Sequence, residues 1–105
     1  MYKLPERDWK VVKKLHPILL QRYCQQVFED VHALTEGDEC DYQAAYLKLY
    51  KLVRDRNKNI GHLFDGFSRG QATMMIMTWK RQHLITEEEL AMFSDETQAA
   101  VDFSE

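Results

Sequence analysis

The segment from Ser68 to Ile85 constrains the fold most, because on a helix its apolar residues occupy two separate sides. One side consists of Ala72, Met75, Ile76, Trp79 and His83, and the other of Met74, Met77, Leu84 and Ile85, with Gly70 and Arg81 among them. A surface helix needs only one apolar stripe, so a helix with two must be covered twice. The pattern predicts a helix over 68–85 at the centre of the fold or at the seam of an oligomer, with His83 partly buried.

Composition indicates one globular domain. The chain has 105 residues, of which 45% are hydrophobic, and we expect a single α-helical domain over residues 1–105. The net charge of −3 provides no overall basic field to attract nucleic acid or an anionic membrane. No apolar run approaches the roughly 18 residues of a membrane span, and no signal segment opens the chain, so we expect a cytoplasmic protein with no membrane contact. Cys24 and Cys40 form no C-x-x-C pair and are expected to be free thiols.

Two helices are predicted in the first third of the chain, separated by Pro17. The first covers Lys3 to His16, and its inward face is formed by Trp9, Val12 and His16. Pro17 lacks an N–H and restricts the residue before it, so the first helix should end or kink there. The second covers Pro17 to Glu36, where apolar residues recur at steps of three and four. These residues are Leu20, Cys24, Val27, Val31 and Leu34.

A third helix is predicted from a cap at Asp41 to about Asn59, after the polar turn 35–41. Its buried stripe would consist of Tyr42, Ala45, Tyr46, Leu49, Leu52, Val53 and Arg56. The short turn favours an antiparallel hairpin with the second helix. Residues 60–67 include two glycines and are predicted to connect to the 68–85 helix, with Phe64 and Phe67 packed beneath it.

Three further helix starts are indicated by capping residues. Ser68 with Gln71, and Thr86 with Glu89, match the capping box, in which each side chain bonds the other residue's backbone N–H. Ser94 is expected to cap a last short helix. We therefore predict an all-α fold, a compact helical bundle of four to six helices built on an antiparallel helical hairpin.

The run from Leu84 to Ser94, LITEEELAMFS, follows Gly66 and the segment that begins at Ser68. This arrangement resembles a recurrent layout in short all-helical bacterial proteins of uncharacterised function. The resemblance covers the latter half of the chain and consists mostly of capping residues. It implies a helical fold and a bacterial or mobile-element origin, and it assigns neither an activity nor a functional residue.

The sequence contains no pattern typical of an enzyme. None of the four histidines lies three to five residues from another histidine or a cysteine, as zinc sites usually require. The chain has no G-x-S-x-G, no glycine-rich phosphate loop and no H-E-x-x-H. We therefore predict a protein that is not an enzyme, with no catalytic, cofactor-binding or metal-binding residues.

Two groups of residues are candidates for a functional surface. The candidate interface lies on the second side of the 68–85 segment, because methionine and arginine are enriched in protein interfaces; it consists of Met74, Met77, Arg81 and Leu84. The candidate basic face lies on the outer side of the third helix, where cations recur every three or four residues and can contact phosphate or an acidic partner; it consists of Lys48, Lys51, Arg54 and Lys58.

These surfaces lead to one main prediction and two alternatives. The main prediction is a non-enzymatic protein-interaction module, homodimeric or bound to another protein, because so small a domain has few elements with which to cover a helix on two sides. The first alternative is a nucleic-acid-binding or regulatory protein that uses the basic face. The second is a small-molecule sensor with a pocket between Trp79 and the tyrosines Tyr23, Tyr46 and Tyr50.

Overall fold

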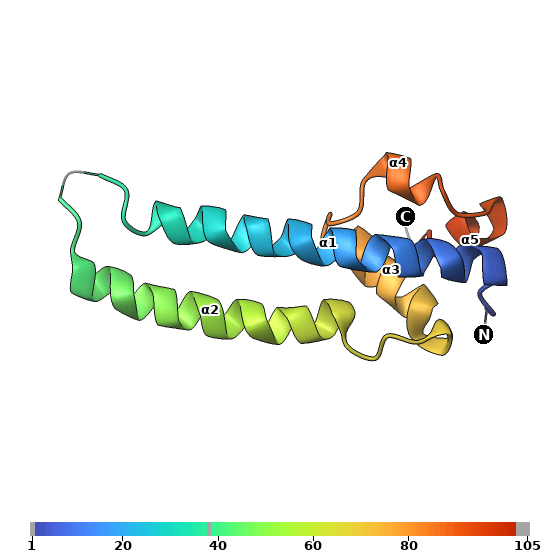
Figure 1. Cartoon of the computed structure of the whole chain (residues 1–105), viewed down its shortest axis with the longest axis horizontal. Helices are drawn as coiled ribbons and strands as arrows, with labels where there is room; N and C mark the ends of the chain where they lie inside the picture. The colour runs from blue at the N-terminus through green and yellow to red at the C-terminus, as the bar shows by residue number, and fades with distance from the viewer. Residues whose placement is uncertain (1, 38, 103–105) are drawn as a thin grey trace.

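The computed structural model describes residues 2–37 and 39–102, which form an all-α fold (Figure 1). The elements in chain order are α1 (Glu6–Ala33), α2 (Tyr42–Phe64), the 3-10 turn η1 (Arg69–Gln71), α3 (Ala72–Arg81), α4 (Glu87–Leu90) and α5 (Asp95–Ala100). The predicted fold class is confirmed, since five α-helices pack as a bundle and the described residues contain no strand. No helix within these ranges is both long enough and apolar enough to span a membrane.

Helices α1 and α2 lie side by side and antiparallel, which confirms the predicted hairpin (Figure 1). The turn between them includes Gly37, whose φ of 101° suits a residue without a Cβ. Asp41 caps α2 as predicted, because its carboxylate accepts a hydrogen bond of 3.1 Å from the backbone N–H of Ala44. Two side-chain pairs, Tyr23 with Asn59 and Asp30 with Arg56, join the two helices along their length.

The predicted end of the first helix at Pro17 is wrong, because one helix of 28 residues, α1, runs through the proline. Proline in a helix removes the hydrogen bond to the carbonyl four residues earlier, here that of Lys13. Both Pro17 and Lys13 lie on the exposed side of α1, where water can bind that carbonyl. On the opposite side Leu15 and Leu19 are fully buried, and their packing holds the helix together across the proline.

The boundary between α2 and α3 also differs from the prediction. Residues 60–64, assigned to a connection, continue α2, because Leu63 and Phe64 belong to the core. The capping box at Ser68 does not form: its side chain makes no capping bond, and the residues after it form η1. The α-helix expected over 68–85 is therefore the shorter α3. Phe67 is partly exposed and packs on His16, with their ring centroids 4.2 Å apart.

Helix α3 ends in a Schellman motif that the sequence analysis did not foresee. The N–H of Leu84 bonds the carbonyl of Trp79, and the N–H of His83 bonds that of Lys80. His83 has a φ of 57°, in the left-handed region that glycine usually occupies. The expectation that His83 is partly buried is thus wrong; it is exposed, and Leu84 after it turns into the core.

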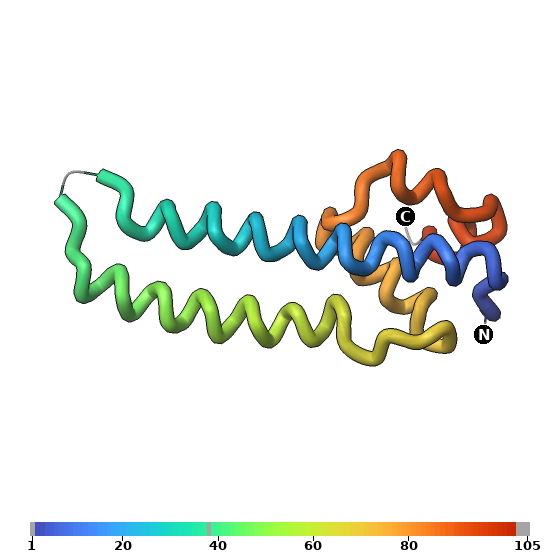
Figure 2. Tube along the Cα trace, in the orientation of Figure 1, coloured from blue at the N-terminus to red at the C-terminus, as the bar shows by residue number. Residues whose placement is uncertain are grey.

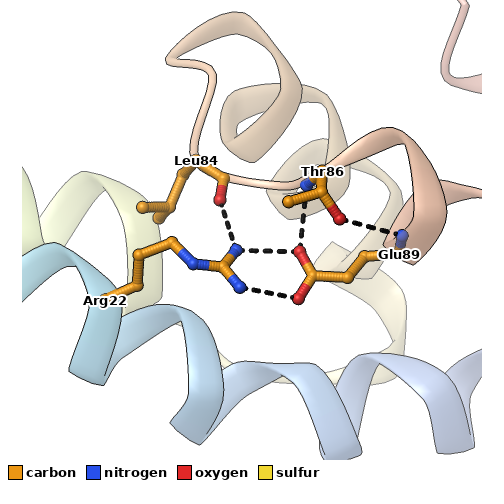
Figure 3. Close-up of polar contacts among 4 residues, drawn as sticks. All are labelled: Arg22, Leu84, Thr86 and Glu89. Carbon is orange, nitrogen blue, oxygen red and sulfur yellow. Dashed lines mark hydrogen bonds and ion pairs between the residues drawn. The ribbon is translucent and has the colours of Figure 1, made fainter.

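The capping box predicted at Thr86 and Glu89 is confirmed, and an arginine from α1 completes it (Figure 3). Arg22 donates two hydrogen bonds of 2.8 Å to the Glu89 carboxylate and a third to the carbonyl of Leu84. These bonds, together with those from Thr86, outweigh the effect of burial and lower the pKa of Glu89 to about 2. The short helix α4 is therefore held against α1 by charge as well as by packing.

A buried carboxylate ties α5 to the start of α1. Asp8 is fully buried and accepts hydrogen bonds from the backbone N–H and hydroxyl of Ser94 and from the hydroxyl of Thr97. Tyr2 shares a further hydrogen bond of 2.7 Å with Thr97. Burial disfavours the charge on Asp8, but the bonds from Ser94 and Thr97 outweigh it and hold the pKa of the carboxyl below its ordinary value. Ser94 also caps α5, as predicted.

The helices are distributed unevenly along the hairpin. Figures 1 and 2 show α3, α4 and α5 gathered at one end, against the first half of α1 and the last part of α2. We call this end the head (residues 2–23 and 59–102) and the remainder of the hairpin the arm (residues 24–37 and 39–58). The extents are 53 × 27 × 24 Å, and the radius of gyration of 16.9 Å exceeds the roughly 13 Å of a compact domain of this length. The arm therefore projects from the head.

Candidate functional site

The structure does not bring the candidate interface of α3 together on one surface. Met74 is 59% exposed and Arg81 is exposed, but Met77 packs against the core and Leu84 is only 2% exposed. The reason is the helix end at Arg81, after which the chain leaves the helical path and carries Leu84 inward. An interface that uses all four side chains would require the head to open.

The candidate basic face lies where the sequence placed it. Lys48, Lys51, Arg54 and Lys58 are all exposed on α2. Arg54 is partly engaged within its own helix, since its guanidinium is 3.7 Å from the Asp55 carboxylate and lies over the Tyr50 ring. The face is thus available in the arm, with one of its four cations already near a carboxylate.

The pocket proposed between Trp79 and three tyrosines does not form. Trp79 is completely buried in the head, and its indole N–H donates a hydrogen bond of 2.9 Å to the carbonyl of Leu63. Tyr46 and Tyr50 lie on the arm and are exposed, whereas Tyr23 is buried beside Asn59. These side chains therefore line no common cavity.

The polar side chains buried in the described part of the chain are hydrogen-bonded. Among residues 2–37 and 39–102, every buried side-chain nitrogen or oxygen has a hydrogen-bond partner. In the same ranges, no three histidine, cysteine, aspartate or glutamate side chains are grouped so that they could hold a metal ion. Cys24 and Cys40 are free and half-buried.

The arm carries the most conspicuous exposed surface of the described chain. Because the head helices cover only one end of the hairpin, residues that continue the apolar stripes of α1 and α2 into the arm are exposed or only half-buried. On α1 these residues step by four and three, and on α2 by four and seven, so each set lies on one side of its helix. We call them the apolar face: Cys24, Phe28, Val31, Tyr42, Tyr46 and Val53.

Two shallow hollows show that the two stripes adjoin. Phe28 and Val53 line a hollow of about 130 Å³ near the middle of the hairpin. Val31 lines a second hollow of about 250 Å³ nearer the turn, together with Tyr42 and Tyr46. The apolar face is therefore a shallow grooved surface shared by two helices.

The exposure of this surface is high for large apolar side chains. Phe28 is 64% exposed, Tyr42 73% and Tyr46 67%. With a full surface of roughly 200 Å² each, these three rings together leave about 400 Å² open to solvent. Contiguous apolar patches of a few hundred Å² on a small protein commonly mark a site of interaction.

Sequence reasoning assigned five of the six residues of the apolar face to buried stripes and did not single out Phe28. Tyr42, Tyr46 and Val53 match the helical period of a buried stripe, and no feature of the period tells which turns a third helix covers. The available signal was the imbalance between two long helices in the hairpin and the short segments left to cover them. Comparisons with protein-family models, with curated proteins and with solved structures find no match to this chain.

Proposed function

We propose that this protein is a non-enzymatic protein-interaction module that binds through the apolar face of the arm. The observation that carries the proposal is the exposure of Phe28, Tyr42 and Tyr46 on one side of the hairpin. Aromatic side chains are enriched in interfaces, where they bury a large area with few rotatable bonds. A homodimer is one form that such a module takes.

The division between head and arm supports this proposal. The head has a core of its own, in which Trp79, Phe93 and Leu63 are buried, and ionic contacts hold its short helices in place. Fixed at one end in this way, the arm presents a surface that is already ordered before a partner arrives. Pre-organisation lowers the entropic cost of binding.

The proposal is tested by photo-crosslinking in the native host, with a photoreactive phenylalanine analogue at position 28 or 46. We expect both positions to yield adducts with protein. The matched control is position 47, because Leu47 is equally exposed at 61% but lies on the outer side of α2. Adducts that form equally from position 47, or no adducts from positions 28 and 46, would show that the apolar face is not a binding surface.

A second candidate function is binding of nucleic acid through the basic face, favoured by the exposure of all four cations. Four phosphate contacts correspond to a log–log salt slope of roughly −3.6 and a loss of about two orders of magnitude in affinity between 50 and 200 mM salt. We expect no tight binding near physiological salt, because the net charge of −3 opposes it. Fluorescence anisotropy with duplex DNA measures this. Binding that persists at 200 mM salt and is lost on Lys51→Glu with Arg54→Glu would promote this function to first place.

A further inference from the structure

The charge of the hairpin is opposite in sign to that of the whole chain. Residues 9–28 and 42–64, which make up most of α1 and α2, contain nine lysines and arginines and a single acid, Asp55. The whole chain has a net charge of −3, so its acids are concentrated elsewhere. Residues 84–102, which include α4 and α5, contain six acids and neither lysine nor arginine. The hairpin is therefore a basic element of an acidic protein.

Three of the hairpin cations lie on the side of α1 that carries the apolar face. Lys10 and Lys13 precede Phe28 and Val31 by 18 residues each, which is five full turns at 3.6 residues per turn. Lys14 lies one turn beyond Lys10. These lysines therefore continue the side of α1 occupied by Phe28 and Val31 into the head.

The three lysines are open to a partner. All three side chains are exposed, and no carboxylate in the described part of the chain lies within ion-pair distance of them. The ammonium of Lys13 lies over the Trp9 ring, 5.7 Å from its centroid, which leaves the charge accessible. Pro17 and Gln21 continue this side of α1 towards the arm, and both are exposed. A partner seated on the apolar face can therefore extend along α1 as far as the lysines.

The other long edge of the apolar face, on α2, is also basic. Tyr50 follows Tyr46 by one turn, and the guanidinium of Arg54 lies over the Tyr50 ring, 5.9 Å from its centroid. Lys58 follows Arg54 by one further turn and is exposed. Arg54 is also near the carboxylate of Asp55, so Lys58 is the less engaged of the two cations. Cations thus border the apolar face on both helices.

The two hollows of the apolar face set the spacing of the apolar groups that could fill them. Val31, in the hollow near the turn, lies seven residues after Cys24 in the middle hollow, and Tyr42 lies eleven residues before Val53. At 1.5 Å per residue the hollows are roughly 10–16 Å apart. Residues seven or eleven apart on a helix span the same distance and lie on one side. One side of a helix can therefore reach both hollows.

We infer that the apolar face binds an amphipathic α-helix of another protein, in which acidic residues flank a stripe of apolar residues. This inference rests on the proposed function, since it names the partner of the same surface. An amphipathic helix in an apolar groove is a recurrent mode of recognition. Acidic flanks would pair with the lysines of α1 on one edge and with Arg54 and Lys58 on the other, whereas basic flanks would be repelled. The more acidic end of the partner lies towards the head, because Glu36, Glu39 and Asp41 make the opposite end of the arm negative.

A selection from a displayed peptide library, with the full chain as the target, tests the chemistry of the partner. The library consists of helices of about 24 residues, enough for the roughly 32 Å between Lys10 and Val31. Each helix carries an apolar stripe and a free choice of glutamate, glutamine or lysine beside it. We expect the enriched peptides to carry glutamate several times as often as lysine. Equal use of the two, a preference for lysine or no enrichment at all would overturn the inference.

Variants of the chain test where an enriched peptide binds, with fluorescence anisotropy as the measurement. Phe28→Ala should raise the dissociation constant roughly tenfold, as the loss of an aromatic anchor does. Lys13→Glu should raise it roughly fivefold, as expected for an exposed ion pair. Lys48→Glu is the matched control, because Lys48 is equally a cation exposed on the hairpin but, two residues after Tyr46, lies on the opposite side of α2. We expect this control to bind as the wild type does, and all three variants to keep the circular dichroism of the wild type, since the three side chains are exposed.

Two results would contradict this location. A Phe28→Ala variant with the wild-type dissociation constant would show that the peptide binds elsewhere. A Lys48→Glu variant as weak as Lys13→Glu would show that the peptide responds only to the overall charge of the hairpin.

Two other occupants of the apolar face are distinguishable from an acidic helix. The chain alone should not sediment with vesicles of equal parts phosphatidylserine and phosphatidylcholine, and light scattering should give the 12.5 kDa of one chain. Vesicle binding that is lost on Phe28→Ala would assign the face to an anionic membrane, and a dimer lost on the same substitution would assign it to a second copy. Either result overturns the inference.

Failure of this inference is separable from failure of the proposed function. If the enriched peptides are rich in lysine but position 28 still yields adducts with protein in the host, the apolar face binds a protein of different chemistry. If position 28 yields no adduct and the selection enriches no peptide, both fail.

Discussion

The pairing of Arg22 with Glu89 predicts that one carboxylate contributes a large share of the stability of the head. The substitution Glu89→Gln removes the charge but retains a side chain that suits the third position of a capping box. It therefore isolates the ion pair with Arg22 from the capping bonds with Thr86. Figure 3 shows the bonds from Arg22 and from the backbone N–H of Thr86 meeting at this carboxylate, while the Thr86 hydroxyl accepts from the backbone N–H of Glu89.

The expected magnitude follows from the pKa of Glu89, which is lowered from 4.5 to about 2. Each unit corresponds to about 1.4 kcal/mol of preference for the charged form in the folded state, so the shift is equivalent to roughly 3 kcal/mol. Part of it comes from Thr86, and Arg22 is 31% exposed, so water screens the pair. We expect Glu89→Gln to lower the free energy of unfolding by about 2 kcal/mol at pH 7.

The lowered pKa of Glu89 also predicts how the free energy of unfolding changes with pH. Because the pKa of Glu89 is lower in the folded state than in the unfolded state, the unfolded chain binds more protons as the pH falls below about 4.5. The stabilisation is complete above that pH and is lost as the pH falls towards about 2. The difference between wild type and Glu89→Gln should therefore shrink towards zero in acid.

Urea unfolding followed by circular dichroism, at pH 7 and near pH 3, measures both quantities. Glu88→Gln is the control, because Glu88 is exposed on the same short helix and undergoes the same change of charge. We expect this control to shift the free energy of unfolding by less than about 0.5 kcal/mol. A cost of Glu89→Gln that is equally small at pH 7, or as large at pH 3 as at pH 7, would refute the assigned role of the ion pair.

Three further predictions concern the head. His83→Gly should raise the free energy of unfolding by about 1 kcal/mol in the same urea assay, because glycine relieves the left-handed conformation, and a decrease would contradict that account. Asp8→Asn should cost roughly 2–3 kcal/mol, because an amide cannot accept all the bonds that Ser94 and Thr97 donate; a melting temperature equal to that of wild type would show that the network is dispensable. Leu84→Glu should abolish cooperative unfolding while Met74→Glu leaves it unchanged, since only the first buries a charge, and equal effects in a thermal melt would contradict the placement of these side chains.

Prediction from sequence succeeded for three of the four caps, whose determinants are local, while the capping box at Ser68 did not form. The caps at Asp41, Thr86 and Ser94 form as expected, because each requires only a side chain and a backbone N–H two or three residues away. It failed where tertiary packing decides. Burial carries α1 through Pro17, and core contacts of residues 60–64 extend α2 beyond the predicted connection.

The basic face and the apolar face differ in the same respect, because only the first depends on local sequence alone. Exposure of the basic face follows from helical period alone and was predicted. The apolar face depends on how far the head helices reach along the hairpin, which is a property of the whole chain. The burial of Leu84 was missed for a different reason. Helix α3 ends at Arg81, and this end is stabilised by the left-handed conformation of His83, which sequence patterns rarely indicate. The chain then carries Leu84 into the core.

The hydrogen bonds between Asp8 and Ser94 also bear on the order of events during synthesis. The two residues are 86 positions apart, so at typical rates of elongation the ribosome needs roughly 4–17 s to deliver the partner after Asp8 has been made. Helix formation takes only microseconds, so synthesis, and not helix formation, sets the time at which this carboxylate can be buried. Throughout that interval water must solvate Asp8, and the nascent helix must leave uncovered the side on which α5 will finally pack.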